Sequence, residues 1–123
     1  MSEVPPTIKR GSTGDAVKGL QNALRALSYN VGSIDGVFGN GTETALKEFQ
    51  RQNGLSDDGI AGPHTWAALH IHLVASGETL SRIAEEELGE ANRWPEVFDL
   101  NRELVADPDK IHPGQVLALP SAG

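Results

Sequence analysis

The chain has 123 residues, of which 38% are hydrophobic and 22% are charged, and its formal net charge is −7. This composition predicts a globular protein of one or two small domains, and without a long apolar run it excludes a transmembrane helix and so membrane insertion. The absence of cysteine rules out a disulfide scaffold, a thiolate zinc site and a cysteine nucleophile.

Charge is unevenly distributed along the chain. Residues 1–70 carry 6 basic and 7 acidic side chains, whereas residues 71–123 carry 4 and 10. Such an acidic surface makes nucleic acid and anionic membranes poor partners. The first six residues have no apolar core typical of a secretory signal, so we expect a cytoplasmic or particle-bound protein, or a wall-associated one if a leader was removed.

The first 30 residues predict a leader and a helix. Residues 1–7 are expected to form a flexible leader. Ser12 is a candidate cap with Asp15 three positions later, and a helix follows over about 14–27. The helix is predicted from apolar residues at helical spacing, which are Val17, Leu20, Leu24 and Leu27.

An internal repeat follows this helix. The pattern of residues 35–46, which begins Asp-Gly, returns 23 residues later as residues 58–69. Each copy is typical of a tight turn feeding a helix, because Asp-Gly permits a positive φ. In the first copy Asn40 and Glu43 have the spacing of a capping box, which predicts a helix over about 41–53.

The second copy begins its helix differently. Gly62 is the expected cap and Pro63 the first helical residue, in a short helix that carries Trp66 and Leu69. With the apolar faces of the two preceding helices, this helix completes a core for roughly 60 residues, near the lower limit for independent folding. We therefore expect an N-terminal all-α three-helix bundle.

Residues 8–69 resemble the three-helix peptidoglycan-binding domain that accompanies many cell-wall hydrolases. The resemblance rests on many positions in order and spacing: Gly14-Asp15-Ala16-Val17, Leu20-Gln21, Leu24, Asp35-Gly36-Val37-Phe38-Gly39, Thr42, Ala45, Phe49-Gln50, Asn53-Gly54-Leu55, Asp58-Gly59, Gly62 and Thr65-Trp66. It implies a wall-peptide groove at Asp35, Gly36, Phe38 and Gly39. The alternative is a turn whose aspartate caps backbone amides and whose Phe38 lies in the core.

After Leu69 the pattern changes to strand, helix, helix, strand. Residues 70–75 predict a strand, Thr79 caps a helix that Gly89 ends, Asn92 caps a second helix, and residues 115–119 predict the closing strand. The strands are expected to pair antiparallel with both helices on one face. This is an α+β fold of the βααβ type.

Residues 71–120 resemble a LysM domain, a module that binds N-acetylglucosamine-containing glycans. The residues that carry the resemblance are Gly77-Glu78-Thr79-Leu80, Ile83-Ala84, Trp94, Asn101, Ile111-His112-Pro113-Gly114-Gln115-Val116-Leu117 and Leu119-Pro120. Two positions depart from the family pattern: Glu78 replaces the usual aspartate, and His72 replaces what is often an aromatic residue. The expected domains are thus a leader over 1–7, a peptidoglycan-binding-like domain over 8–69 and a LysM domain over 70–123.

The LysM resemblance implies a glycan groove between two loops. Its residues are Ser76, Gly77, Glu78, Thr79, Leu80, Asp107, Pro108, Lys110, Ile111, His112 and Pro113. Backbone amides in tight turns suit sugar hydroxyls and the acetamide, and apolar surface suits ring faces. The alternative is that these glycines, threonine and prolines serve only the fold.

Other candidate chemistries are weaker. His70 and His72 fall on one face of the first predicted strand, with His64 and His112 elsewhere, but a zinc site needs three or four converging ligands. We therefore expect surface histidines, no metal and no cofactor. No nucleophile with a nearby base stands out, so no catalytic residues are predicted.

The sequence thus predicts a non-catalytic protein with two modules that bind peptidoglycan or a chitin-like glycan. The alternative is a cytosolic, phage-tail or contractile-injection baseplate adaptor, which uses the LysM fold for protein docking or ion response. The acidic second half favours that alternative at least equally, because a neutral glycan needs no net charge. Its partners would be other proteins of an injection or wall-associated assembly.

Overall fold

A computed structural model describes residues 4–120 of the chain. The first three residues of the expected leader and the last three of the expected LysM domain lie outside the described residues. The elements, in chain order, are α1 (Asp15–Ala26), α2 (Asn40–Gln52), α3 (Pro63–Ala68), β1 (Ile71–Leu73), α4 (Leu80–Leu88), the 3-10 turn η1 (Ala91–Arg93), α5 (Trp94–Leu100) and β2 (Val116–Ala118). None of the described helices is long and apolar enough to cross a membrane.

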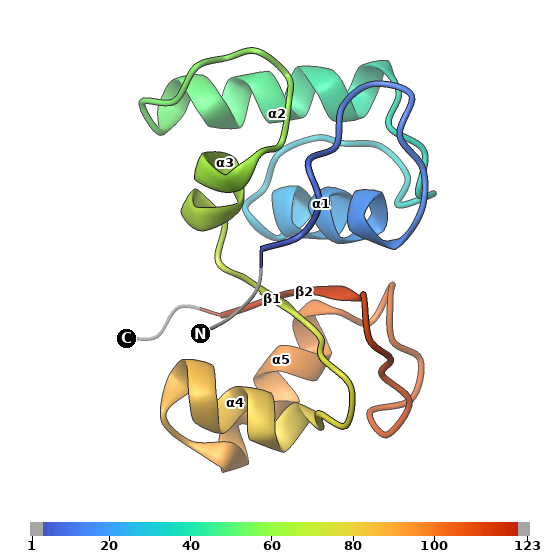
Figure 1. The fold of residues 1–123 in the computed structure, drawn as a ribbon, viewed down its shortest axis with the longest axis vertical. Helices are drawn as coiled ribbons and strands as arrows, with labels where there is room; N and C mark the ends of the chain where they lie inside the picture. The colour runs from blue at the N-terminus through green and yellow to red at the C-terminus, as the bar shows by residue number, and fades with distance from the viewer. Residues whose placement is uncertain (1–3, 121–123) are drawn as a thin grey trace.

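The helical module and the βααβ module are stacked in layers. Figure 1 shows α2 at the top, α3 and α1 beneath it, then the β1–β2 pair, and α4 with α5 at the bottom. The strands pair antiparallel, with His72 opposite Leu117. Both expectations for the fold class, a helical bundle and a two-stranded antiparallel sheet with two helices, are confirmed.

Several predicted caps are confirmed and others are wrong. Thr79 accepts a hydrogen bond from the backbone N–H of Arg82 at 3.3 Å, and Gly89 ends α4 in the left-handed conformation. Pro63 begins α3 after Gly62, as predicted. At the start of α1, however, the cap position falls on Gly14, with φ +112°, two residues after the expected Ser12. A positive φ of this kind is readily adopted by glycine.

Two further caps differ from the prediction. Gly39 caps α2 and Asn40 is its first residue, so the expected capping box does not form. Asn92 lies inside η1, and Arg93 precedes α5 with Pro95 in its first turn. In both helices the observed cap lies one residue from the predicted asparagine. Helix boundaries inferred from residue type alone are uncertain by this amount.

The sheet is covered on both faces, which the sequence did not predict. Along β2 the side chains of Val116 and Ala118 join the core of the helical module, whereas Leu117 joins the core beneath α4 and α5. This alternation follows from the two-residue period of a strand. The outer face of the sheet, which two helices on one side would leave open, is closed by α1.

Close packing and polar contacts both fix α1 against the second module. A Cβ atom added at Gly19 would lie 2.3 Å from Cβ of Val116, so only glycine permits this approach. Beside it, Asn22 Nδ2 donates to Asn101 Oδ1 at 2.8 Å and to the Leu100 carbonyl at 3.0 Å. The two modules therefore pack against each other as closely as residues do in a protein interior.

The start of the described chain is also held. Pro5 is buried, and the Pro6 carbonyl accepts a hydrogen bond from Trp66 Nε1 at 3.1 Å. Ile8 and Ala61 form a backbone bridge nearby. Residues 4–8 thus pack on α3 and its preceding loop.

Candidate functional site

The repeat in the first module is built around two buried glutamines. Gln21 Nε2 donates to Asp35 Oδ1 at 3.0 Å, to the Val37 carbonyl at 3.1 Å and to Thr42 Oγ1 at 3.0 Å, while its Oε1 accepts from Gly36 N at 3.0 Å. Each helix that precedes a copy of the repeat thus supplies one amide side chain that closes the following turn.

Gln50 repeats this network in the second copy. Its Nε2 donates to Asp58 Oδ1 at 3.1 Å, to the Ile60 carbonyl at 3.0 Å and to Thr65 Oγ1 at 3.2 Å, and its Oε1 accepts from Gly59 N at 3.0 Å. Both glutamines are 1% exposed. The recurring Asp-Gly and Thr positions are therefore explained by turn closure.

This arrangement places the four predicted groove residues in structural roles. Asp35 accepts from the Val37 N–H at 2.9 Å, and hydrogen bonds from that N–H and from Gln21 lower the pKa of its carboxyl. Gly36 has φ +76°, Phe38 is 1% exposed and Gly39 caps α2. A hollow of about 340 Å³ on this module lies instead at the second copy, beside Ser56, Asp58 and His64.

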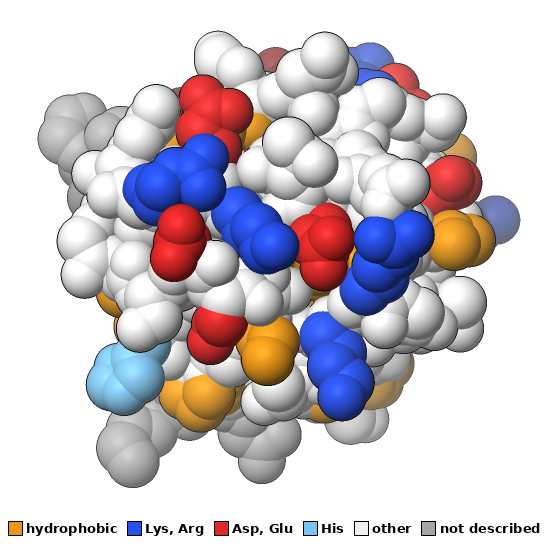
Figure 2. Space-filling view, turned by 90° about the horizontal axis from the view of Figure 1, so that it is seen from above, with side chains coloured by type: hydrophobic (Ala, Val, Ile, Leu, Met, Phe, Trp, Pro, Cys, Tyr) orange, Lys and Arg blue, Asp and Glu red, His pale blue; other side chains and the backbone are white. Residues whose placement is uncertain are grey.

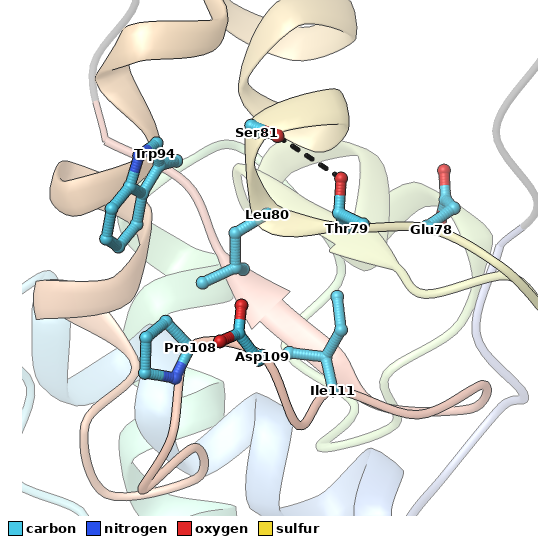
Figure 3. A pocket seen from close by; sticks show the side chains of 8 residues that line it. All are labelled: Glu78, Thr79, Leu80, Ser81, Trp94, Pro108, Asp109 and Ile111. Atoms are coloured by element: carbon cyan, nitrogen blue, oxygen red, sulfur yellow. Dashed lines mark hydrogen bonds between the residues drawn. The ribbon is translucent and has the colours of Figure 1, made fainter.

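In the second module the predicted loops meet at a pocket. A cavity of about 360 Å³ is lined by eight residues: Glu78, Thr79, Leu80, Ser81, Trp94, Pro108, Asp109 and Ile111. Figure 3 shows Trp94 and Pro108 on one side, Thr79 on the other, and Leu80 between them. The pocket therefore combines apolar surface with carboxylate and hydroxyl groups at its rim.

Five of the predicted glycan-loop residues line this pocket, namely Glu78, Thr79, Leu80, Pro108 and Ile111. Six others, Ser76, Gly77, Asp107, Lys110, His112 and Pro113, do not line it. Asp107 instead closes its own turn by accepting from the Asp109 N–H at 2.9 Å. His112 points to the module junction, where its Nε2 lies 3.1 Å from Asp15 Oδ2.

Three lining residues were missing from the predicted site: Ser81, Trp94 and Asp109. Ser81 is the second residue of α4, and its hydroxyl lies 3.3 Å from that of Thr79. Ser81 could have been predicted from the cap at Thr79, because side chains in the first turn of a helix point back toward the loop that precedes it. Trp94 begins α5 and packs at 6.5 Å from Phe98, ring centre to ring centre.

His72 is not the surface histidine that the sequence indicated. It is 3% exposed, its Nδ1 lies 2.6 Å from Glu87 Oε2 and its Nε2 lies 2.8 Å from Glu78 Oε1. Burial disfavours the imidazolium, but these two carboxylates outweigh burial and raise the pKa of His72. Glu87 is half-buried in this contact.

The remaining surface gives little sign of a charged binding face on the first module. Figure 2, which views the molecule from the side of α2, shows basic and acidic side chains interspersed, with apolar ones between them. Arg51 pairs with Asp57 at 3.3 Å, and Arg10 with Glu43 at 3.5 Å. Within residues 4–120 no group of three or more histidine and acidic side chains is arranged to hold a metal ion.

Comparison with known proteins agrees with the two modules. Residues 13–69 match the family described as a putative peptidoglycan binding domain, and residues 72–120 match the LysM domain. The chain therefore carries a peptidoglycan-binding domain followed by a LysM domain, and it belongs to these two families of binding modules.

Several curated proteins are similar to this chain. The potassium binding protein Kbp of Escherichia coli is 34% identical over 108 residues, which cover 88% of this chain and 60% of Kbp. The N-acetylmuramoyl-L-alanine amidase CwlM of Mycobacterium tuberculosis is 43% identical over 76 residues, which cover 61% of this chain and 19% of CwlM. The chain thus spans 60% or less of the length of these curated relatives.

A solved structure is also similar. The crystal structure of the SleB N-terminal domain has 43% identity and a TM-score of 0.50, and the match covers 51% of this chain and 86% of that one. Peptidoglycan-binding modules of this kind indicate cell-wall binding. Relatives include lytic enzymes, such as the spore cortex-lytic enzyme of Bacillus subtilis, 34% identical over 84% of this chain and 33% of the enzyme.

Proposed function

We propose that this chain is a non-catalytic binder of cell-wall glycan and that its LysM pocket takes N-acetylglucosamine units. The observation that carries the proposal is the 360 Å³ pocket, where apolar walls from Trp94, Leu80 and Ile111 face polar groups of two loops. Apolar walls suit sugar ring faces and the acetamide methyl, and polar groups suit the hydroxyls.

The chemistry of the rim supports a neutral ligand. Glu78 and Asp109 are the charged residues of the lining, and both are acidic, so an anionic ligand would be repelled. Thr79 and Ser81 provide hydroxyls that both donate and accept. A glycan with N-acetyl and hydroxyl groups matches this combination.

The absence of catalysis is part of the proposal. The two matched modules account for residues 13–69 and 72–120, which leaves no space between them for a catalytic domain. Zymography on purified cell wall tests this part. A cleared zone produced by the purified chain would contradict it.

The binding test fills the pocket without disturbing the core. Ser81 is exposed at the rim, so Ser81→Arg places a long side chain in the cavity. We expect the wild-type chain to sediment with insoluble peptidoglycan and Ser81→Arg to sediment less. The control is Ser33→Arg, at a serine of the first module that is also exposed, and it should sediment like wild type. A wild-type chain left in the supernatant would contradict the proposal.

The shared core determines how this test is built. Cutting the chain near residue 70 would expose Val116 and Ala118, which pack against α1. Separate halves would then lose binding for reasons of folding. Point variants of the full chain avoid that ambiguity.

An ion-responsive or docking role is the second candidate. It is favoured by the similarity to Kbp, a potassium binding protein by name, over 88% of this chain. Titration with KCl, with NaCl as control, monitored by the fluorescence of Trp94 and Trp66, tests it. A response to potassium at matched ionic strength would favour this role over the glycan role.

A further inference from the structure

His72 is held by a carboxylate at each ring nitrogen. Glu87 of α4 lies 2.6 Å from Nδ1, and Glu78 of the loop before α4 lies 2.8 Å from Nε2. A neutral imidazole has one N–H donor, whereas the imidazolium has two. Two ionised carboxylates, which only accept, are therefore both satisfied only by the protonated ring.

Glu78 links this histidine to the pocket. Its Oε1 also accepts from the Ala75 N–H at 2.7 Å, which closes the turn over residues 75–78. Glu78 lines the cavity, and the next residue, Thr79, caps α4. Figure 3 shows Glu78 and Thr79 side by side on the loop at the rim.

The two residues that depart from the LysM pattern are thus in direct contact with each other. Their usual counterparts, an aromatic residue and an aspartate, would not form this ion pair, because an aromatic ring carries no charge. The exchange at both positions turns a hydrophobic strand position into a titratable one next to the loop.

The two carboxylates around the ring favour its protonated form. Glu87 comes from α4, Glu78 comes from the loop, and Arg82 of α4 acts on Glu78. From β2, the opposite residue is the apolar Leu117. Burial raises the pKa of Glu78, but the hydrogen bonds from His72 and Ala75 outweigh it and lower that pKa.

We propose that His72 is a positioning residue for the glycan pocket, and that loss of its proton releases the loop over residues 75–80 and weakens ligand binding. The inference rests on the proposed glycan function for its ligand. When the ring becomes neutral, one carboxylate faces a nitrogen lone pair, so that contact becomes repulsive. Either Glu78 or Glu87 must then move, and movement of Glu78 breaks its hydrogen bond with the Ala75 N–H.

The first measurement needs no ligand. In an NMR titration of the full chain, the His72 ring protons report protonation and the Ala75 amide proton reports its bond to Glu78. We expect both to follow one midpoint, above the ordinary histidine value of about 6.5. An Ala75 signal that does not change through the His72 midpoint would overturn the inference.

The second measurement is the affinity for a chitin oligosaccharide from about pH 5 to about pH 9, a range that brackets histidine titration. We expect wild-type affinity to fall about fivefold across the His72 midpoint, the effect of one hydrogen bond of ordinary strength. Glu87→Gln, which keeps the side-chain size and removes one charge, should lower the midpoint in both measurements. His64→Gln, at an exposed histidine of the first module, should reproduce the wild-type profile.

The outcomes separate the two proposals. A wild-type affinity that is constant through the midpoint would overturn the role of His72 while leaving the glycan site standing. Absence of binding at every pH would overturn the glycan site, and the ligand-free titration would still decide whether His72 controls the loop. A midpoint unchanged by Glu87→Gln would exclude Glu87 from the coupling.

Discussion

In the first module, the polar side chains near the turns form hydrogen bonds within the fold. Gln21 and Gln50 each bond to an aspartate, a backbone carbonyl, a threonine hydroxyl and a glycine N–H. In the second module, the loop of Glu78 and Thr79 borders an open pocket. Both loops carry Gly and acidic residues before a helix. The same residue types therefore close a turn in one module and border a cavity in the other.

The difference shows why a repeated motif is not by itself a binding motif. Asp35 and Asp58 recur because a buried amide needs an acceptor at the same point of each turn. The partner of Glu78, in contrast, is a titratable side chain, His72, whose charge depends on pH. This comparison predicts opposite responses to substitution and pH in the two modules.

The largest effect is expected for Gln21→Leu. The substitution leaves the Gly36 N–H and the buried Thr42 hydroxyl without their partner, and we expect a loss of about 3 kcal/mol in the free energy of unfolding. Urea denaturation followed by circular dichroism measures it. Gln50→Leu should match it within about 1 kcal/mol, because its network is the same.

The control for this prediction is Gln52→Leu, at an exposed position of α2. Surface substitutions change stability by about 0.5 kcal/mol or less. A Gln21→Leu variant as stable as Gln52→Leu would contradict a structural role for the repeat.

The next effect tests the boundary between the two modules. Alanine normally stabilises a helix interior relative to glycine by about 1 kcal/mol. At Gly19 the added Cβ would meet Val116, so we expect Gly19→Ala to destabilise the chain by about 2 kcal/mol in urea denaturation. The neighbouring exposed Lys18→Ala is the control, and a stabilised Gly19→Ala variant would mean that the modules separate freely.

The third prediction concerns stability against pH in the second module. The folded state raises the pKa of His72, so its contribution is complete below about pH 6.5 and is lost as pH rises through the folded value. The folded state lowers the pKa of Glu78, so that contribution is lost only as pH falls through its folded value. We expect the free energy of unfolding to fall by about 1 kcal/mol on the alkaline side, which urea denaturation at a series of pH values measures. Glu87→Gln should shift that decline to lower pH, and an unchanged curve would contradict the prediction.

The smallest effect is expected at Asp35, which is exposed. Hydrogen bonds from the Val37 N–H and from Gln21 lower the pKa of its carboxyl, so its contribution is present above the ordinary aspartate value and is lost as pH falls through the folded one. Asp35→Asn keeps the size of the side chain and should slightly reduce the acid sensitivity of unfolding. An acid transition with an unchanged slope and midpoint would show that the carboxyl is not stabilised by its turn.

The helices and the strand order could be predicted because they depend on local spacing. The apolar stripe Val17, Leu20 and Leu24 specifies the buried face of α1, and all three are completely buried. The contacts between the modules could not be predicted in this way. Gly19 carried a signal, since glycine inside a helix has a cost that must be offset, but its partner Val116 lies 97 residues later in the sequence.

The candidate site was predicted in part for a similar reason. The two loops were found from the LysM pattern, whereas Trp94 and Ser81 reach the pocket from the helices beside them. The glutamine networks were missed because Gln50 follows Gln21 by 29 residues, not by the 23 of the repeat. The buried state of His72 follows from Glu87 in α4, a contact that no local period reveals.

The position of β2 at the end of the described elements has a consequence for synthesis of the chain. Ala26 ends α1 and Val116 begins β2, so 89 residues are translated between them, which takes about 4–18 s at usual ribosome speeds. The helical module can assemble its own core during this time, but the side of α1 near Gly19 remains without Val116 until the last strand emerges. Although α1 is the first of the described helices, it is therefore fully covered only after β2 has been made.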